Sequence, residues 1–559
     1  MRNPGRQRFL IWAGLACVLL VFVVLVVRIH PTNFFGLTED DSIYFTSAKA
    51  LAQGQGYTVP SVPGKPAATK YPILYPWMLS CVWRWNPSFP SNLRVAIGMS
   101  AAFGAIFLCL AFCFVRELKG FSDAEALIVT LICGMEPLFV LYSGSVLTEV
   151  PFAAFTLGAL YLADEAMRPG GGSKPLFCGA LVGTASFIRV LGVPVAAGIL
   201  CCGLVRKQYR ACALFCASFL PFMCLLAWRI VFPAHLMQPV AASFRSNPAW
   251  QREWAYYTSY IADWRNDVPN LHIFWLMLKN HAIALMLGPS EFFVSLFTER
   301  GKQVSLTLAV IITAAVITGV IRQARQSEWK PIHFALPFYM GTIVLWSYLD
   351  ATRFLVPFLP LFAAGLWFEG KFALRLAGKA AASGSAGGEK MAAATIALGV
   401  LFVAGGIGWH YFSAMKSIRA KSFERAAFLE SKKDAYEWLV TQTSPGTRVI
   451  AYEDALLYLY TGRTAMRPTT FVIADFLEAP RMNKVMAEMG DVAPAIGAAC
   501  WLVSDDDFSM ESRTVTLPAR AREKEIQLPS ALAYRSPDGR VGVFCQRGLQ
   551  PAYGSWGGR

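Results

Sequence analysis

The first long apolar stretch of the chain, FLIWAGLACVLLVFVVLVV, occupies residues 9–27 and contains no charged side chain. About 20 apolar residues in a helix cross the hydrocarbon core of a bilayer. The stretch follows Arg2, Arg6 and Arg8. Such a start is typical of a secretory signal peptide and also of an anchor whose N-terminus stays in the cytoplasm. The apolar run is long and no clear small-residue cleavage site follows it, so we expect a retained anchor.

The composition of the whole chain is also that of a membrane protein. Its 559 residues are 55% hydrophobic and 16% charged, with a mean hydropathy of +0.43. Because soluble proteins average about 25% charged residues, this composition excludes a disordered chain and disfavours a soluble enzyme. The net charge of +15 indicates either nucleic-acid binding or cytoplasmic loops rich in Lys and Arg.

Further apolar stretches predict about eleven membrane spans in all. After the first, we place them at 92–115, 124–141, 146–166, 175–188, 190–205, 210–231, 303–321, 332–349, 354–369 and 391–411. Residues 271–297 are also apolar, but Lys279, His281 and Pro289 interrupt them. That region is therefore an extra span, a re-entrant pair or an interfacial helix.

The basic residues support this layout. The alternate loops expected inside contain Arg116, Lys119, Arg168, Lys174, Arg206, Lys207, Arg210, Arg322, Arg325, Lys330, Lys371, Arg375, Lys379 and Lys390. This distribution obeys the positive-inside rule, so the net charge requires no nucleic-acid partner. Arg189 and Arg353 are the exceptions, because each lies in a short turn that we expect outside, and we treat them as candidate functional residues.

Two parts of the chain are expected outside the membrane. One is the first loop, 28–91, which we include in a mainly α, polytopic helical bundle covering 1–411. The other is a small α/β domain over 412–559. In that domain Ser422–Thr441 has helical periodicity, and short strands are expected at Arg448–Tyr452, Ala498–Val503 and Val541–Cys545.

Cys500 and Cys545 lie in two of these expected strands. A disulfide between them could form in an oxidising periplasm. Sequence spacing does not supply the geometry that a disulfide needs, so their pairing stays open here.

The first loop begins with three consecutive acids, Glu39, Asp40 and Asp41, just before an amphipathic stretch that ends near Ala52. Acids at the start of a helix are stabilised by its dipole and its unpaired N–H groups, which is one explanation of them. The other is a general base or a metal ligand placed where the membrane meets water.

Three other positions carry charge where chemistry could use it. Lys70 precedes Tyr71 and a proline pair, and it is either a surface lysine or a holder of an anionic head group. Glu149 lies at the outer end of a span, where a solvated acid costs little, or it belongs to the site. Arg353 either pairs with Asp350 across a turn or, like Arg189, offers its planar fork of donors to phosphate oxygens.

Taken together, these motifs resemble the GT-C superfamily of polyprenyl-phosphate-dependent glycosyltransferases, near the bacterial protein-mannosyltransferase and aminoarabinose-transferase branch. The residues that carry the resemblance are Asp40-Asp41-Ser-Ile-Tyr44, Lys70-Tyr71-Pro-Ile-Leu-Tyr-Pro76, Leu147-Thr-Glu149-Val-Pro151, Ser186-Phe-Ile-Arg189 and Arg353-Phe-Leu-Val-Pro357. The chain departs from the family in having Asp41 where the family has Glu.

The resemblance implies an inverting transfer of a sugar from a polyprenyl-phosphate donor to a lipid, glycan or protein acceptor at the outer face. It implies Asp40 as the base and Asp41 as an orienting residue, with Lys70, Arg353 and Arg189 on the phosphate. Tyr44, Tyr71 and Glu149 are the further binding candidates. If a divalent cation takes part, Asp40 and Asp41 would hold it. The implied location is the bacterial inner membrane, with the N-terminus inside.

Two other functions remain open at this point. A transporter or flippase of envelope precursors is the main alternative, although no internal repeat is visible. The other is a non-catalytic scaffold in envelope assembly. The sequence contains no Walker A motif, no dinucleotide-binding glycine fingerprint and no nucleophile elbow, which argues against ATP-driven transport and the common soluble chemistries.

Overall fold

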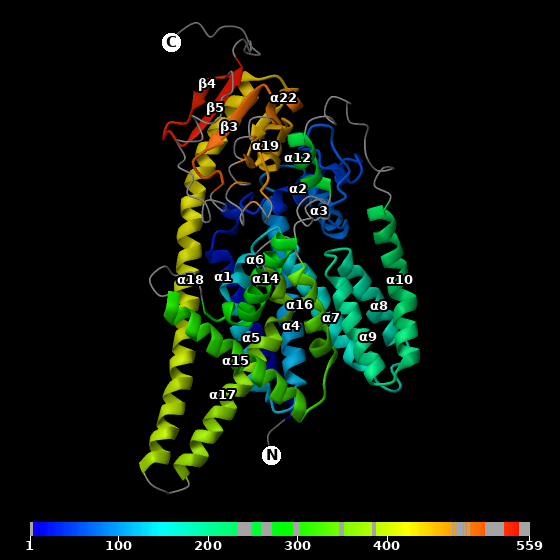
Figure 1. Cartoon of the computed structure of the whole chain (residues 1–559), viewed down its shortest axis with the longest axis vertical. Helices are drawn as coiled ribbons and strands as arrows, with labels where there is room; N and C mark the ends of the chain where they lie inside the picture. The colour runs from blue at the N-terminus through cyan, green and yellow to red at the C-terminus, as the bar shows by residue number, and fades with distance from the viewer. Residues whose placement is uncertain are drawn as a thin grey trace. The chain divides into compact units, whose positions relative to one another are not determined.

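The computed structural model describes most of the chain and divides it into two compact units (Figure 1). The described residues are 4–231, 248–258, 271–294, 302–345, 352–382, 387–471, 475, 480, 484–485, 488, 492–508 and 530–546. Unit 1 comprises Met1–Pro31, Ile97–Cys224 and Lys279–Ala420, and unit 2 comprises Thr32–Ala96, Leu225–Leu278 and Lys421–Arg559. The first loop thus clusters with the C-terminal residues.

Unit 1 is built from helices that correspond to the predicted spans. Their bounds are α1 Pro4–Arg28, α4 Leu93–Arg116, α5 Asp123–Met135, α6 Pro137–Ser143, α7 Glu149–Ala166, α8 Lys174–Ser186, α9 Gly192–Val205, α10 Tyr209–Val231, α14 Leu271–Glu291, α15 Lys302–Gln326, α16 Pro331–Val344, the 3-10 helix η3 Thr352–Phe358, α17 Leu359–Ala382 and α18 Gly387–Gln442. The mainly α fold class is confirmed. The region that the sequence left open, 271–297, forms the single helix α14 as far as Glu291.

Within the described residues, six helices are long and apolar enough to cross a membrane, or seven if the bent pair α5–α6 is one span. The sequence predicts more spans because α8, α9 and α16 are apolar but have only 13 or 14 residues. At 1.5 Å per residue such helices are about 20 Å long, less than the roughly 30 Å of a hydrocarbon core.

Small residues let neighbouring helices of unit 1 approach closely. A side chain at Gly319 of α15 would overlap the backbone of Gly365 in α17, and one at Gly198 of α9 would overlap the backbone of Ala335 in α16. Close backbone contact at small residues is a main source of helix association in membranes. These contacts fix the helical frame that carries the turns with Arg189 and Arg353.

Glu136 is a buried acid between two apolar helices, and its role there is structural. It lies at the 66° bend between α5 and α6, where its carboxylate accepts hydrogen bonds from the backbone N–H groups of Leu138 (3.1 Å) and Phe139 (2.6 Å). Pro137 begins α6 with no N–H to satisfy. The buried acid therefore caps a broken helix.

Unit 2 contains a small mixed sheet and the helices of the first loop. The helices are α2 Asp40–Ala52, α3 Leu74–Trp85, α12 Pro248–Thr258, α19 Asp454–Thr461 and α22 Val492–Ile496. The strands are β1 Val449–Ala451, β2 Ala465–Met466, β3 Cys500–Ser504, β4 Ser530–Arg535 and β5 Val541–Gln546. The sheet order is β2-β1-β3-β5-β4. Strand β1 is parallel to β2 and β3, while β5 is antiparallel to β3 and β4.

The predicted C-terminal sheet is confirmed. Strands β1, β3 and β5 lie where the sequence placed them, whereas the two-residue β2 and the edge strand β4 were not predicted. The predicted helix over 422–441 is the end of α18, which begins at Gly387 and has 56 residues. Its buried residues Ala435, Tyr436 and Leu439 pack in one core with the inner face of the sheet.

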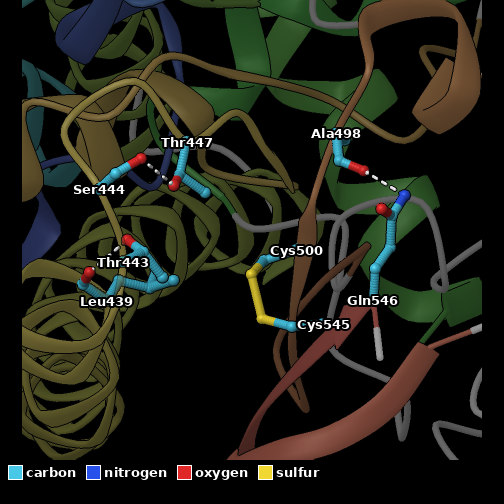
Figure 2. Close-up of a disulfide and its surroundings, with 8 residues drawn as sticks. All are labelled: Leu439, Thr443, Ser444, Thr447, Ala498, Cys500, Cys545 and Gln546. Atoms are coloured by element: carbon cyan, nitrogen blue, oxygen red, sulfur yellow. Dashed lines mark hydrogen bonds between the residues drawn. A yellow bond between two sulfur atoms is a disulfide. The ribbon is translucent and has the colours of Figure 1, made fainter. Parts of the chain in front are cut away.

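A disulfide joins the two central antiparallel strands of this sheet (Figure 2). Cys500 of β3 and Cys545 of β5 are direct partners in the strand register, with their Cα atoms 4.1 Å apart. Beside it, the Gln546 amide donates a hydrogen bond to the carbonyl of Ala498 at 3.1 Å. The pairing that the sequence left open is therefore present.

Candidate functional site

In unit 1, two arginines from turns far apart in the sequence converge on one carboxylate. Glu149 begins α7, and its side chain is 1% exposed. One of its oxygens, Oε1, accepts from Arg189 Nη1 at 2.6 Å and from Arg353 Nε at 2.6 Å. Arg189 Nη1 also donates to Thr148 Oγ1 at 2.9 Å. The structure thus brings together three of the residues that the sequence singled out.

The two arginines share an aromatic support. The guanidinium carbon of Arg189 lies 4.6 Å from the ring centre of Phe354, and that of Arg353 lies 5.5 Å from it. The Phe354 carbonyl accepts a hydrogen bond from the buried Tyr339 hydroxyl at 2.8 Å. Guanidinium groups stack favourably on aromatic faces, so Phe354 helps to fix the direction in which both forks point.

Both arginines stay partly exposed beside the buried carboxylate. Two guanidinium groups donate to the same carboxylate oxygen. The side chains of Arg189 and Arg353 are 14% and 16% exposed, whereas that of Glu149 is 1% exposed. Forked donors of this kind bind phosphate oxygens in pairs. The Asp350–Arg353 pair that the sequence suggested lies outside the described residues, since Asp350 is not among them.

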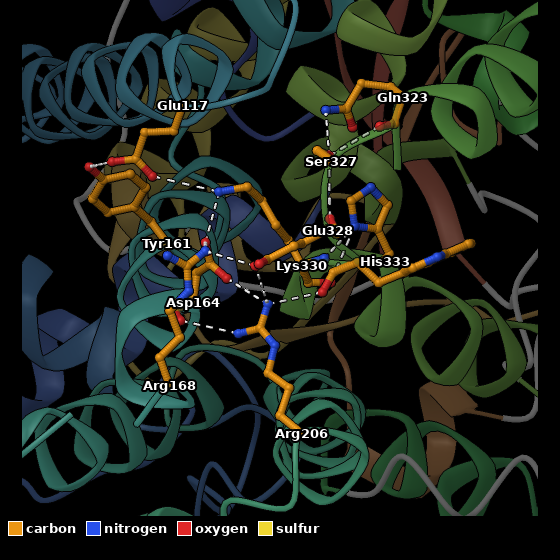
Figure 3. A network of polar contacts seen from close by, with 11 residues as sticks. Glu117, Tyr161, Asp164, Arg168, Arg206, Gln323, Ser327, Glu328, Lys330 and His333 are labelled. Atoms are coloured by element: carbon orange, nitrogen blue, oxygen red, sulfur yellow. Dashed lines mark hydrogen bonds and ion pairs between the residues drawn. The ribbon is translucent and has the colours of Figure 1, made fainter. Parts of the chain in front are cut away.

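The opposite end of α7 carries a different cluster of charges (Figure 3). Asp164 accepts from Arg206 Nη2 at 2.9 Å, from Lys330 Nζ at 2.8 Å and from Arg168 Nη2 at 3.1 Å. All three cations come from loops that we expected inside. Since 15 residues of helix rise about 22 Å, the Asp164 cluster and the Glu149 cluster lie at opposite ends of unit 1.

In unit 2, the first acid of the loop motif lies against an aromatic cluster. Asp40 begins α2, and its Oδ1 accepts a hydrogen bond from the Tyr71 hydroxyl at 2.6 Å. The ring of Tyr44 meets Tyr71 edge-on at 4.8 Å and Tyr75 at 5.6 Å. Asp40 is half-buried. The two predicted tyrosines are therefore brought to the acid that the resemblance assigns as the base.

Asp41 holds its own turn together. It is buried, and its carboxylate accepts from the backbone N–H groups of Gly36 at 3.0 Å and Ser42 at 2.6 Å. Gly36 has a φ of +88°, in the left-handed region that glycine tolerates. Burial raises the pKa of Asp41 to about 7. Its carboxylate thus orients the turn that presents Asp40. The sequence offered helix capping as one explanation of these acids. The N-cap residue is Glu39, and its side chain makes no capping hydrogen bond.

Lys70 is not a plain surface lysine. Its side chain is buried, with Nζ 3.6 Å from the ring centre of Tyr256 and 5.3 Å from that of Tyr71. The Tyr256 hydroxyl donates to Glu39 Oε2 at 2.9 Å, and Arg467 forms an ion pair with the same oxygen.

Sequence reasoning missed Tyr256 and Arg467, because neither lies in a recognisable motif. Glu39 stood in the quoted acidic run, but its partners come from positions more than 200 residues away. Among the described residues, no three His, Cys, Asp or Glu side chains gather as metal ligands would.

Comparisons with known proteins place the fold. No family model matches the sequence, and no curated protein does. Among solved structures, ArnT from Cupriavidus metallidurans bound to undecaprenyl phosphate has a TM-score of 0.50 and 13% identity, covering 96% of this chain and 99% of ArnT. The apo oligosaccharyltransferase of Archaeoglobus fulgidus has a TM-score of 0.53 and 12% identity, covering 96% of this chain and 75% of the other.

A third structure agrees with these two. AglB from Archaeoglobus fulgidus, in complex with an inhibitory peptide and a dolichol-phosphate, has a TM-score of 0.50 and 12% identity, again covering 96% of this chain and 75% of the other. Similarity at this level of identity extends over nearly the whole chain and concerns the fold. This chain therefore shares the fold of ArnT and AglB, as the resemblance of its motifs predicts.

Proposed function

We propose that the protein is an integral-membrane glycosyltransferase that moves a sugar from a polyprenyl-phosphate donor to an envelope acceptor at the outer face of the membrane. The observation that supports this most directly is the convergence of the partly exposed Arg189 and Arg353 on the buried Glu149. The solved relatives in fold bind undecaprenyl phosphate or a dolichol-phosphate. A phosphate is the group that such a pair of forks suits best.

The proposed reaction uses one base and several cations. The acceptor hydroxyl oxygen attacks the anomeric carbon, and a new C–O bond forms as the bond from that carbon to the phosphate oxygen breaks. The polyprenyl phosphate leaves with the electron pair, and the configuration inverts. Asp40 takes the acceptor proton, while the Tyr71 hydroxyl fixes the direction of its carboxylate.

The cations act on the leaving group. Arg189 and Arg353 would bind the phosphate oxygens on which charge develops, and donors fixed before the reaction stabilise such charge strongly. The Phe354 ring and the Glu149 carboxylate hold both forks in place. Lys70 is the third cation assigned to the phosphate. If a divalent cation takes part, Asp40 and Asp41 are the carboxylates proposed to hold it, and Asp41 also binds the backbone N–H groups of its own turn.

The location that we propose is the bacterial inner membrane, with the N-terminus inside and residues 412–559 outside as a separate domain. The Cys500–Cys545 disulfide supports an outer location of that domain, because disulfides persist in oxidising compartments. The three cations gathered at Asp164 support an inner location for that end of unit 1.

The test begins with the product. Mass spectrometry of envelope glycoconjugates from cells with and without the gene should reveal one modification that depends on the protein, and so identify the sugar and the acceptor. Full-length protein in lipid nanodiscs is then assayed with polyprenyl phosphate carrying that sugar. Asp40→Asn should lower the transfer rate by about 100-fold or more, while Asp434→Asn, an exposed acid on α18, should not.

Unchanged glycoconjugates, or movement of a lipid-linked sugar across the bilayer without covalent transfer, would favour the transporter instead. Undiminished transfer by Asp40→Asn in a correctly inserted protein would remove Asp40 as the base.

A further inference from the structure

The backbone just before Asp40 adopts a conformation that needs support. Glu39 has a φ of +58°, in the left-handed region that residues with a side chain seldom occupy. Such a residue persists when its surroundings hold it there. Because Glu39 directly precedes Asp40, its backbone angle sets where α2 begins and where the Asp40 carboxylate points.

Two side chains from other segments hold Glu39. Arg467, next to β2, forms an ion pair with its Oε2, and the Tyr256 hydroxyl of α12 donates to the same oxygen at 2.9 Å. Arg467 is 6% exposed and Glu39 is 12% exposed, so this pair is shielded from solvent. The Arg467 guanidinium carbon also lies 4.1 Å from the ring centre of Tyr452, which limits its freedom.

Tyr256 connects this pair to Lys70. The Lys70 ammonium lies 3.6 Å from the Tyr256 ring centre, and the Arg467 guanidinium carbon lies 5.8 Å from the same ring. Lys70 and Arg467 therefore both lie close to the Tyr256 ring. The hydroxyl of that ring is bound to Glu39, the residue that directly precedes Asp40. A cation close to a tyrosine ring is attracted by it, so Tyr256 orients Lys70.

Helix α12 itself is fixed to the C-terminal residues. The Tyr257 hydroxyl donates to Asp454 Oδ2 at 2.8 Å, and Glu253 accepts from the backbone N–H of Thr470 at 2.6 Å and from its hydroxyl at 2.5 Å. These buried contacts leave α12 little room to shift. Tyr256 is thus held by the same part of the chain that supplies Arg467.

We propose that Arg467 is a positioning residue for the transfer reaction, which sets the direction of Asp40 through its ion pair with Glu39 and the place of Lys70 through Tyr256. The C-terminal residues then complete the site rather than merely flank it. The catalytic part of this inference rests on the proposed function, whereas the positioning part does not.

The activity test compares four variants of the full-length protein in nanodiscs. Arg467→Gln and Glu39→Gln should each lower kcat by about 10- to 100-fold, because small misplacements of reacting groups cost that much. Arg467→Lys keeps the ion pair and should recover most of the loss. Arg463→Gln is the control: the guanidinium of this buried arginine donates to the backbone carbonyls of Thr461, Val440 and Thr443, and its loss should leave kcat within about threefold.

Amide hydrogen exchange tests the positioning without any substrate. Arg467→Gln should speed exchange in the first turn of α2, residues 40–44, and around Lys70, and Arg463→Gln should not. If the wild type transfers no sugar, the proposed function fails and the exchange result still decides the positioning. Unchanged exchange at residues 40–44 would overturn it, and so would a kcat loss for Arg463→Gln equal to that for Arg467→Gln.

Discussion

The Tyr71 hydroxyl donates a 2.6 Å hydrogen bond to Asp40 Oδ1 across 31 residues of the first loop. Tyr71→Phe removes this donor and leaves the ring contact with Tyr44 in place. We expect kcat to fall by about 10-fold or somewhat more, since a hydrogen bond to a charged group contributes about 1.5 kcal/mol or somewhat more. The measurement is steady-state transfer in nanodiscs. Tyr75→Phe, which also keeps its ring against Tyr44, is the control, and an equal loss there would contradict a specific role for Tyr71.

Arg353 should act mainly on donor binding. Arg353→Gln removes one of the two forks beside Glu149, and we expect KM for the polyprenyl-phosphate donor to rise about 10- to 100-fold, the equivalent of about 1.5–3 kcal/mol for a charged hydrogen bond. Donor titrations measure this. Arg168→Gln removes a guanidinium at the other end of α7 and should leave KM unaltered, so a similar rise in both would argue against a phosphate site at Arg353.

Glu149 should matter for stability as well as binding. Glu149→Gln leaves two arginines beside each other without their shared carboxylate. Removing one partner of a buried ion pair costs about 3–5 kcal/mol, and the partial exposure of both arginines puts our expectation near the lower end of that range. Thermal unfolding in detergent should show a lowered Tm, and added polyprenyl phosphate should restore part of it. No protection by the lipid would contradict the anion site.

The stability of unit 2 should fall as the pH rises through the range set by Asp41. Burial raises the pKa of Asp41 from 3.8 to about 7, so the folded state binds a proton that the unfolded state has released. The native state therefore binds more protons between about pH 4 and pH 7, and stability decreases with pH across that window. At 1.36 kcal/mol per pH unit, the total is on the order of 4 kcal/mol.

Asp41→Asn removes this titration and should flatten the dependence of Tm on pH between about pH 4 and pH 7. Asp454 and Asp507 also have pKa values raised to about 7 by burial, so the variant should keep part of the slope. A slope equal to that of the wild type would show that Asp41 is not the buried proton carrier.

The disulfide gives a test of both stability and location. Cys500 and Cys545 close a loop with a sequence separation of 45, and loss of such a bridge costs about 4 kcal/mol by loop entropy. Cys500→Ser with Cys545→Ser should therefore lower Tm. In intact cells, both thiols should react with a maleimide only after reduction. Ready reaction without a reductant would contradict an outer location for residues 412–559.

The sequence predicted the parts of the site that lie in short local motifs. Asp40 and Tyr44 share one turn, Lys70 and Tyr71 are neighbours, and Arg189 and Arg353 stood out because they broke the charge pattern of the loops. Helical apolar stretches were recognised because their signal is long and continuous. The C-terminal strands β1, β3 and β5 were found because each is a continuous apolar run, although a shorter one.

The sequence could not predict which distant residues bind each other. Nothing local indicates that Arg353 binds Glu149, which is 204 residues away, or that Arg467 binds Glu39. Strand β2 has two residues and no pattern of its own, and it forms only because β1 offers it a free edge. Among the described residues, six or seven helices or helix pairs are long and apolar enough to cross a membrane, fewer than the sequence predicts, since apolar composition alone does not measure the length of a helix.

Helix α7 carries an acid near each end, and each acid forms ion pairs with cations. Glu149 is bound by Arg189 and Arg353, and Asp164 is bound by Arg168, Arg206 and Lys330. With both ends fastened, the helix cannot slide along its own axis without breaking at least one buried ion pair. The ion pairs at its two ends therefore hold α7 in register with the segments that carry Arg189, Arg353, Arg206 and Lys330.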